Sequence, residues 1–272
     1  MISGADENLR DKFKKAVYQS RLDRQSRLEI NTGLNFLLNV SGWRRGSVSI
    51  ILGTTSSGKS TIVRTIISDI LAKNSKTKIS CFLSEETSGE YSLELFKAFN
   101  NTSFEKRIDF YSEQECIDEN ESASLLSKAF EDGNEILIYD NITTSDLYNT
   151  KTPQEQSKFS NNLKRAANKT NKALICVAHT NNVDKIAGKL VNSSDIRGSK
   201  NLPNIAEFFF INHQISASEN LYNYIQIEKH RGQSPANKFF MMMFDRKRNI
   251  FSSDLAVKFD KFKEMHKTRD KI

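Results

Sequence analysis

The sequence predicts an α/β fold in which a mainly parallel twisted sheet is flanked by helices and continues into a C-terminal antiparallel extension. Between about residues 33 and 253, short apolar and β-branched runs alternate with helical patterns, as the βα units of a parallel sheet require. The first of these runs leads through a glycine-rich turn into an amphipathic helix. The last runs follow one another over short loops without a helix between them, which favours antiparallel pairing.

The expected strands are read from these apolar runs. The parallel part of the sheet is expected at residues 48–52, 78–84, 107–111, 135–140 and 173–178. The antiparallel extension is expected at residues 207–212, 222–228 and 238–244. After the first run, apolar residues recur at helical spacing from Ile62 to Leu71, so a helix is expected there.

The chain is expected to divide into three parts. Residues 1–30 carry many charges with apolar residues at helical spacing, which predicts an amphipathic linker helix. That helix would pack either on its own domain or on a neighbouring subunit, and the sequence leaves both open. Residues 31–255 are expected to form the α/β domain, and residues 256–272 a basic tail, where Phe259, Phe262 and Met265 indicate a short helix.

Composition narrows the class of protein. The chain has 272 residues and a formal net charge of +7, which is compatible with an anionic partner and does not establish one. The three cysteines lack the spacing of a disulfide framework or a metal site, so a reducing compartment is expected. No apolar run approaches the roughly 18 residues of a membrane span, and the first residues lack a signal-peptide core. We therefore expect a soluble cytoplasmic protein without a membrane partner.

Residues 48–61 contain a strand-like run, the pattern Gly53-x-x-x-x-Gly58-Lys59-Ser60 and the start of a helix. This is a phosphate-binding loop in its strand–loop–helix context. The glycines let backbone N–H groups and the helix N-terminus face a polyphosphate. Lys59 would reach the β- and γ-phosphates, and the Ser60 hydroxyl would bind Mg²⁺. The expected nucleotide-binding residues are Gly53, Thr54, Thr55, Ser56, Ser57, Gly58, Lys59, Ser60 and Thr61.

Two further strand-like runs lead to carboxylates. The run at 135–140 ends in Asp140, which we expect to hold the Mg²⁺ shell. The run at 78–84 is followed by Glu85 and Glu86, and a carboxylate there is suited to activate the attacking water as a general base. Adjacent residues of an extended strand point to opposite faces, so only one of these glutamates can face the nucleotide. The strand pattern leaves the choice between them open.

A third run, at 173–178, is followed by His179, which is suited to contact the γ-phosphate and report its presence to the next loop. That loop, residues 181–203, is polar and rich in glycine and cations, as expected of a mobile segment that follows a phosphodiester backbone. A second candidate loop on the same edge of the sheet lies at residues 143–151. The candidate DNA contacts among the cations are Lys185, Lys189, Arg197 and Lys200.

Lys229 and Arg231 end another strand-like run, two residues apart, so they would project on the same side of it. Two cations at a strand tip suit insertion into a neighbouring subunit's nucleotide site. There they would neutralise charge on the transferred phosphoryl group. A surface charge pair is the alternative.

With these motifs in order, residues 33–244 resemble the RecA-like ATPase core of the DnaB family of hexameric replicative helicases, in superfamily 4. The resemblance assigns the general base to Glu85 rather than Glu86 and makes Lys229 and Arg231 a trans-acting finger. It also adds Gly198 and Ser199 to the implied DNA contacts. The segments that carry it are Trp43-Arg-Arg-Gly46, Phe82-Leu-Ser-Glu85, Ser194-Asp-Ile-Arg-Gly-Ser199 and Lys229-His-Arg231-Gly232.

The resemblance implies an ATP-driven motor that acts as a homo-oligomeric ring, a hexamer, on single-stranded DNA and separates duplex strands in DNA replication. ATP and Mg²⁺ would lie between subunits, and residues 31–255 would be the RecA-like ATPase motor domain. We find no counterpart of the family's N-terminal domain, so contact with a primase or a loader is left open. The implied location is the cytoplasm of a bacterium or of a phage-infected host.

Two other hypotheses remain. One is a RecA- or KaiC-like recombination or regulatory ATPase, which forms filaments or rearranges partners without unwinding. The other is a nucleotide-gated DNA-binding or scaffold module, in which ATP only orders the oligomer. Glu85 and Arg231 together argue against the second hypothesis, because a pure switch does not need both.

Overall fold

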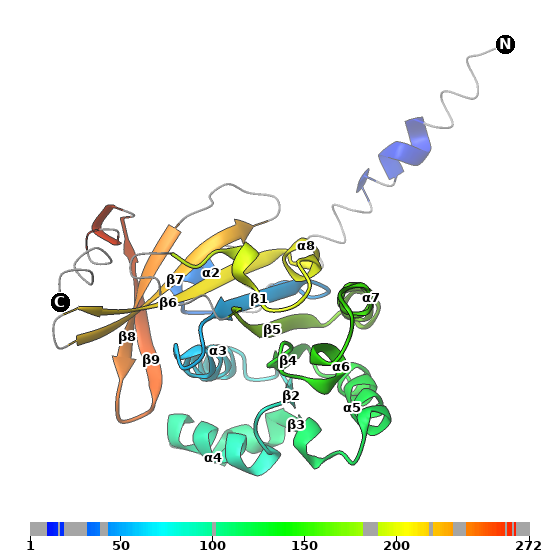
Figure 1. Cartoon of the computed structure of the whole chain (residues 1–272), viewed down its shortest axis with the longest axis horizontal. Coiled ribbons are helices and arrows are strands. Elements are labelled where there is room, and N and C mark those ends of the chain that lie inside the picture. The colour runs from blue at the N-terminus through cyan, green and yellow to red at the C-terminus, as the bar shows by residue number, and fades with distance from the viewer. Residues whose placement is uncertain are drawn as a thin grey trace.

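The strands of the molecule form one continuous sheet with helices around its parallel part (Figure 1). The computed structural model describes residues 10–15, 17–18, 32–38, 43–99, 102–181, 190–217, 220–230, 238–258, 260–262 and 264. These residues give a nine-stranded sheet in the order β3-β2-β4-β5-β1-β6-β7-β8-β9. The predicted α/β fold class is confirmed.

The sheet has a parallel part and an antiparallel part that share β6. The parallel strands are β1 (Val48–Gly53), β2 (Ile79–Leu83), β3 (Ile108–Ser112), β4 (Ile136–Asp140), β5 (Ala173–His179) and β6 (Phe208–Ala217). The antiparallel strands that follow β6 are β7 (Asn220–His230), β8 (Lys238–Asp245) and β9 (Ile250–Val257). Because helices cover both faces of the parallel part, its central strands are continuous apolar runs.

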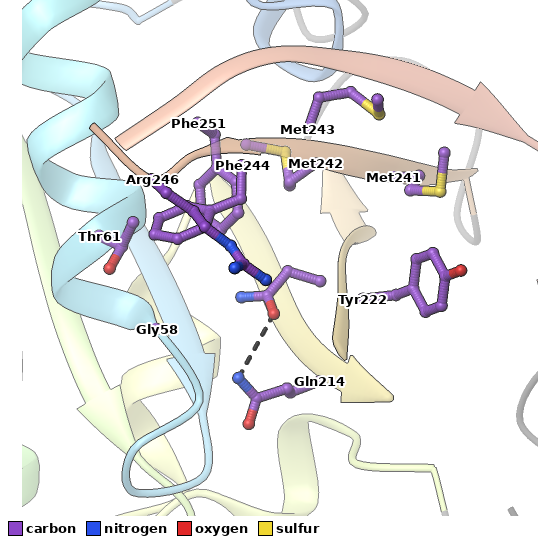
Figure 2. A pocket seen from close by; sticks show the side chains of 11 residues that line it. Gly58, Thr61, Gln214, Tyr222, Met241, Met242, Met243, Phe244, Arg246 and Phe251 are labelled. Atoms are coloured by element: carbon purple, nitrogen blue, oxygen red, sulfur yellow. Dashed lines mark hydrogen bonds between the residues drawn. The ribbon is translucent and has the colours of Figure 1, made fainter. Parts of the chain in front are cut away.

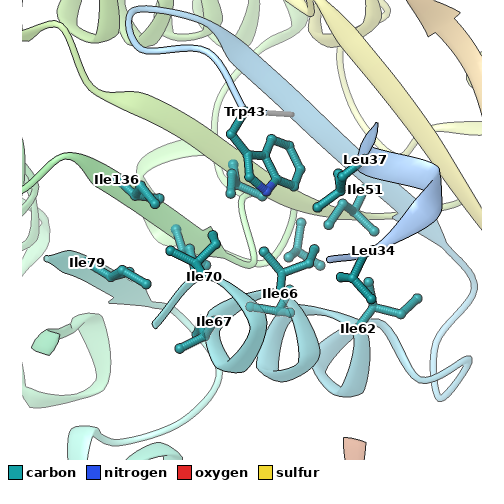
Figure 3. Packing of buried hydrophobic residues seen from close by; sticks show 14 of the residues in the cluster. Leu34, Leu37, Trp43, Ile51, Ile62, Ile66, Ile67, Ile70, Ile79 and Ile136 are labelled. Carbon is teal, nitrogen blue, oxygen red and sulfur yellow. The ribbon is translucent and has the colours of Figure 1, made fainter. Parts of the chain in front are cut away.

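Alternate side chains of the parallel strands enter two hydrophobic cores. Ile51 belongs to the core under α2 (Asn35–Leu38), α3 (Lys59–Lys73) and α4 (Ser88–Phe99). Its neighbour Ile50 belongs to the core under the helices that follow, since adjacent strand residues face opposite sides. Figure 3 shows the isoleucines of α3 against the sheet in the first core. The helices of the second core are α5 (Glu119–Glu131), α6 (Asp146–Asn149), α7 (Pro153–Thr170) and α8 (Asn201–Ile205). Short 3₁₀ turns occupy Thr102–Arg107, Glu113–Glu115 and Ser193–Asp195.

The antiparallel extension differs from the prediction in two ways. The run at 207–212 was predicted to be antiparallel, but it becomes β6, which pairs parallel with β1 and antiparallel with β7. Strand β9 was not predicted, because Ser252, Ser253 and Asp254 interrupt its apolar pattern. Asp254 is nevertheless buried, where its carboxylate accepts the backbone N–H groups of Asn35 (2.8 Å) and Phe36 (2.7 Å). These partners are more than 200 residues away in the sequence, so no local pattern could show them.

The ends of the chain are described only in part. Residues 10–15 and 17–18 are helical, as are residues 260–262 and 264. Phe262 is fully buried against the extension, with 4.1 Å between its ring centroid and that of Phe239. Phe259 and Met265 lie outside the described residues, and the division into a linker, a main domain and a tail stays a prediction. No helix in the described part of the chain is long and apolar enough to cross a membrane.

A buried ion pair lies at the amino ends of the strands, opposite the candidate site. Lys172 precedes β5 and is 2% exposed, and its ammonium donates to an Asp132 carboxylate oxygen at 2.5 Å and to the Asn134 carbonyl at 2.7 Å. The other Asp132 oxygen accepts the hydroxyls of Ser80 (2.5 Å) and Tyr111 (3.0 Å). The lysine therefore neutralises a carboxylate that neutral donors also hold in place.

Lys172→Met is expected to lower the free energy of unfolding by about 3 kcal/mol, because the substitution leaves the Asp132 charge buried without its cation. Urea unfolding of the two proteins measures this difference. Lys169→Met, which changes an exposed lysine on α7, is the matched control and is expected to stay within about 0.5 kcal/mol of wild type. Equal losses in the two variants would contradict a special role for the buried pair.

Candidate active site

The carboxyl ends of β1, β2, β4 and β5 lie along one edge of the sheet because these strands run parallel. Residues at these ends or just beyond them line a pocket of about 350 Å³. Residues 55–61 of the phosphate loop form one side of it, and Glu85, Asp140 and His179 form the other. The structure thus brings together the loop and the three polar strand ends that the sequence singled out.

Two residues of the phosphate loop have left-handed backbone conformations. Ser56 has a φ of 60° and Gly58 a φ of 88°. A Cβ on Gly58 would lie 2.8 Å from the Asn223 side-chain nitrogen, and a Cβ on Gly53 would lie 2.7 Å from the Ser57 hydroxyl. Both glycines are therefore required by close approach, and at Gly58 the backbone angle adds a second reason.

Lys59 is the first residue of α3 and is almost fully buried. Its ammonium donates to the carbonyl of Thr54, at 2.6 Å, across the phosphate loop. Burial lowers the pKa of Lys59 to about 8, although the nearby carboxylates of Asp140 and Glu85 oppose this shift. The ammonium therefore stays largely charged at neutral pH, as a phosphate ligand must.

Asp140 ends β4 and is 7% exposed. Burial raises its pKa to about 7, and repulsion from Glu85 and Glu86 adds to the shift. A divalent cation would stabilise the charged form of such a buried carboxylate. Ser60, which lines the same pocket, offers a hydroxyl oxygen as a further ligand. The described residues contain no group of three or more His, Cys, Asp or Glu side chains suited to hold a metal. The pair fits Mg²⁺ that takes its remaining ligands from phosphate oxygens and water.

Glu85 and Glu86 lie in different surroundings. Glu85 lines the phosphate pocket, where one of its carboxylate oxygens accepts the Asn141 side-chain amide at 3.2 Å. Glu86 does not line this pocket, and burial raises its pKa while Arg64 opposes the shift. This placement matches the choice of Glu85 that the resemblance implied, and its role as a base stays a prediction.

His179 ends β5, and its ring nitrogen lies 3.8 Å from the Glu85 carboxylate. Burial lowers the pKa of His179 to about 4, and the charges of Lys59 and Arg197 lower it further. The imidazole is therefore neutral at pH 7, so its contact with Glu85 is not an ion pair. A neutral imidazole can still donate a hydrogen bond to a phosphate oxygen.

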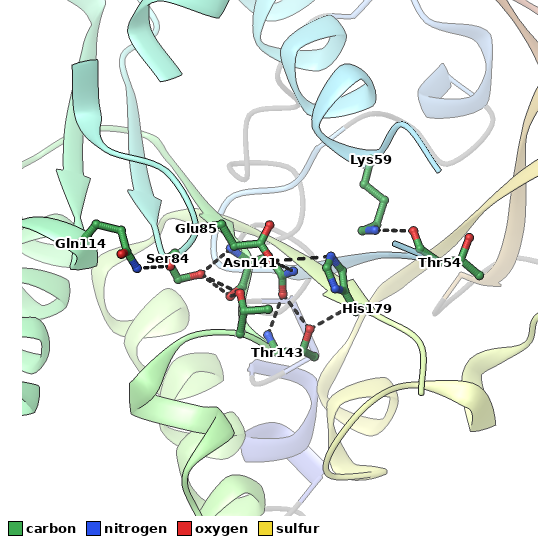
Figure 4. Close-up of polar contacts among 9 residues, drawn as sticks. Thr54, Lys59, Ser84, Glu85, Gln114, Asn141, Thr143 and His179 are labelled. Carbon is green, nitrogen blue, oxygen red and sulfur yellow. Dashed lines mark hydrogen bonds and ion pairs between the residues drawn. The ribbon is translucent and has the colours of Figure 1, made fainter. Parts of the chain in front are cut away.

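A polar network behind these residues was not predicted (Figure 4). The Asn141 side-chain oxygen accepts the backbone N–H and the hydroxyl of Thr143, at 2.8 and 2.7 Å. The Thr143 hydroxyl in turn accepts the backbone N–H of His179 at 2.8 Å. Asn141 thereby links Glu85 to His179. The sequence gives no signal for this, because an Asn after a strand is an ordinary turn residue.

The predicted DNA loop is described at residue 181 and from residue 190 onward, so Lys185 and Lys189 lie outside the described residues. Arg197 and Lys200 are exposed, and the Arg197 backbone N–H donates to the His179 carbonyl at 2.8 Å. The loop therefore begins and returns beside the phosphate pocket.

Gly198 and Ser199 serve the packing of this loop. A Cβ on Gly198 would lie 2.7 Å from the Tyr148 ring. Ser199 is 6% exposed, and its backbone N–H donates to the Tyr148 hydroxyl at 2.8 Å. Its own hydroxyl lies 2.8 Å from that of Ser157. Direct DNA contact by the Ser199 side chain does not fit this conformation, because that side chain is buried against α7.

The predicted trans-acting finger lies at the end of β7. The Lys229 ammonium donates to the carbonyl of Pro203, at 2.5 Å, in α8 of its own chain. Arg231 lies outside the described residues. The shared direction of the two side chains therefore stays a prediction.

A second pocket, of about 490 Å³, adjoins the phosphate loop and was not predicted (Figure 2). Gly58 and Thr61 form its loop side, and the antiparallel extension forms the rest. Its lining includes Phe244, which is 50% exposed, and Arg246. The remaining lining residues are Gln214, Tyr222, Asn223, Met241, Met242, Met243 and Phe251.

Two solved structures that match this chain share its architecture. An ATPase domain matches 88% of this chain over 98% of its own length, at a TM-score of 0.69 and 16% sequence identity. A DnaB-like replicative helicase, described with its interactions with primase, matches 88% of this chain over 66% of its own length, at a TM-score of 0.69 and 15% identity. The fold is that of a helicase ATPase domain. No family model matches the sequence, and no curated protein matches it either.

Proposed function

We propose that this protein is an ATP-hydrolysing motor of the DnaB-like helicase kind, which acts as a ring, a hexamer, on single-stranded DNA in replication. The observation that carries the proposal is the phosphate pocket. A phosphate loop, a buried carboxylate and a second carboxylate in contact with a neutral histidine meet there, at the strand ends of a helicase-like fold. A site that only binds nucleotide would not need the second carboxylate.

In this mechanism Lys59 binds the β- and γ-phosphates, and Ser60 and Asp140 are the residues that would hold Mg²⁺. When bound, Mg²⁺ would supply positive charge against the negative charge that develops on the phosphate. Glu85 accepts a proton from the attacking water, and Asn141 keeps its carboxylate in place through the 3.2 Å hydrogen bond. His179 donates a hydrogen bond to the γ-phosphate. Because the candidate DNA loop begins directly after His179, this contact couples the presence of the γ-phosphate to the position of the loop.

The second pocket is proposed to take the nucleotide base. It adjoins the phosphate pocket, because Gly58 and Thr61 line both pockets. Phe244 and the Arg246 guanidinium offer the faces on which a planar base can stack. The base would lie between α3 and the antiparallel extension.

Lys59→Ala tests the nucleotide assignment. The affinity for ATP with Mg²⁺ is expected to fall by about 10- to 100-fold, because a charge-assisted hydrogen bond to phosphate is worth about 1.5–3 kcal/mol. Isothermal titration measures the affinity, and DNA-stimulated ATP turnover of the wild-type protein measures the activity. Unchanged binding in the variant would contradict the assignment.

Electron microscopy with a non-hydrolysable ATP analogue and an oligonucleotide then distinguishes closed rings from the filaments expected of a recombinase.

The salt dependence of DNA binding tests the loop after His179. If it makes about four to six phosphate contacts, log affinity for single strands should fall against log salt concentration with a slope of roughly −3 to −4. Arg197→Ala is expected to flatten the slope by about 0.7, the contribution of one phosphate contact. Lys128→Ala, an exposed cation on α5, is the control and should leave the slope unchanged. A salt response that is flat in the wild-type protein would contradict backbone tracking.

A further inference from the structure

The phosphate loop is held from outside by two side-chain amides of the antiparallel extension. Asn212 of β6 donates to the Ser57 carbonyl at 2.5 Å, and Asn223 of β7 donates to the same oxygen at 3.0 Å. Both asparagines are buried, at 2% and 7% exposure. A carbonyl oxygen has two lone pairs, so one acceptor satisfies both donors. We call these two residues the asparagine clamp.

The clamp fixes the direction of the peptide group between Ser57 and Gly58. In a planar trans peptide the C=O and N–H bonds point in opposite directions. When the Ser57 carbonyl is drawn toward β6 and β7, the Gly58 N–H is turned to the other side of the chain, where Gly58 lines the phosphate pocket. The reverse orientation would present a carbonyl oxygen to the phosphate, which repels it.

We propose that Asn212 and Asn223 are positioning residues that hold the phosphate loop in its anion-binding form. The proposal rests on the proposed function, since it concerns the same nucleotide site. The amides must turn their nitrogens toward Ser57, because two oxygens would repel each other. The oxygen of Asn223 also accepts the Gln214 side chain, at 3.4 Å, at the wall of the second pocket (Figure 2). The loop and the second pocket therefore share one contact.

Stability of the fold alone does not explain an asparagine at position 212. It follows the apolar residues Phe208 to Ile211 in β6, and its side-chain oxygen is buried without a hydrogen-bond partner among the described residues. Such an unpaired acceptor destabilises a fold, whereas an apolar side chain of similar size would not. The amide is best explained by its hold on the loop.

The test measures magnesium pyrophosphate binding by isothermal titration. Asn223 also lines the second pocket. Because pyrophosphate has no base, its affinity reports on the phosphate loop alone. Asn212→Leu and Asn223→Leu are each expected to weaken binding about fivefold, the equivalent of one neutral hydrogen bond, and the double variant on the order of 25-fold. The KM for ATP should rise by the same factors with little change in kcat, because the lost interaction serves ground state and transition state alike.

Gln226→Leu is the matched control. Gln226 pairs with His213 at 2.7 Å on the same two strands, and it is not among the residues that line the phosphate pocket or the second pocket. Its replacement should lower the melting temperature and leave pyrophosphate affinity unchanged. The Asn212→Leu variant should keep its melting temperature, which preserves the test if the double variant does not fold.

Unchanged pyrophosphate affinity in the clamp variants would overturn the proposal while the proposed function stands. Loss of affinity in Gln226→Leu as well would also overturn it, since general loosening of the strands would then explain the effect. A wild-type protein that binds neither pyrophosphate nor ATP would instead remove the proposed function itself.

Discussion

Arg231→Ala is expected to lower ATP turnover by about 10³- to 10⁵-fold while nucleotide affinity changes little. A guanidinium that enters the site from a neighbouring subunit stabilises charge on the phosphoryl group mainly in the transition state, so its loss affects hydrolysis rather than binding. Among the described residues that line the phosphate pocket, Lys59 is the one lysine or arginine, so a second cation would have to come from another segment or another subunit. Single-turnover hydrolysis and nucleotide titration measure the two quantities separately.

Mixing variants shows whether Arg231 acts on its own site or on the next. A subunit with Arg231→Ala keeps an intact Glu85, and a subunit with Glu85→Gln keeps an intact Arg231. If the arginine acts in trans, mixed oligomers contain complete sites and activity returns. Arg165→Ala, an exposed arginine on α7, is the control and should stay near wild-type activity. Loss of nucleotide binding in Arg231→Ala would make Arg231 a structural residue.

The parts of the site that could be predicted from the sequence are those whose chemistry is local. The phosphate loop is one continuous pattern between a strand and a helix, and the ends of the buried strands at Asp140 and His179 are equally visible. Parallel strands bring such ends to one edge, so their meeting in one pocket follows from the fold class. The predicted grouping therefore required no knowledge of individual contacts.

The parts that could not be predicted depend on distant segments. Asn212 and Asn223 hold Ser57 across 155 and 166 residues of sequence. A signal did exist at Asn212, since an amide ends an otherwise apolar run in β6, but the run alone does not say what the amide contacts. Strand β9 was missed for the same reason. Asp254 is a polar residue that the sequence pattern assigns to a loop, and the backbone N–H groups of Asn35 and Phe36 that bind its carboxylate are distant in the sequence.

The adjacent glutamates show how environment separates two residues that the sequence leaves equivalent. Glu85 lines the phosphate pocket, near Asn141 and His179. Glu86 does not line that pocket, and burial raises its pKa while the charge of Arg64 opposes the shift. A general base must be within reach of the attacking water, which favours the glutamate that lines the phosphate pocket.

Glu85→Gln is expected to lower kcat by about 10²- to 10⁴-fold, because the amide cannot accept the proton of the attacking water. The change removes one charge and keeps the shape of the side chain, and the oxygen of Gln can still accept the Asn141 amide, so ATP affinity should remain near wild type. Glu86→Gln is the matched neighbour, and it should change kcat far less because Glu86 lies outside the phosphate pocket. Single-turnover hydrolysis at saturating ATP compares the two variants directly. A larger loss from Glu86→Gln than from Glu85→Gln would transfer the role of base to Glu86.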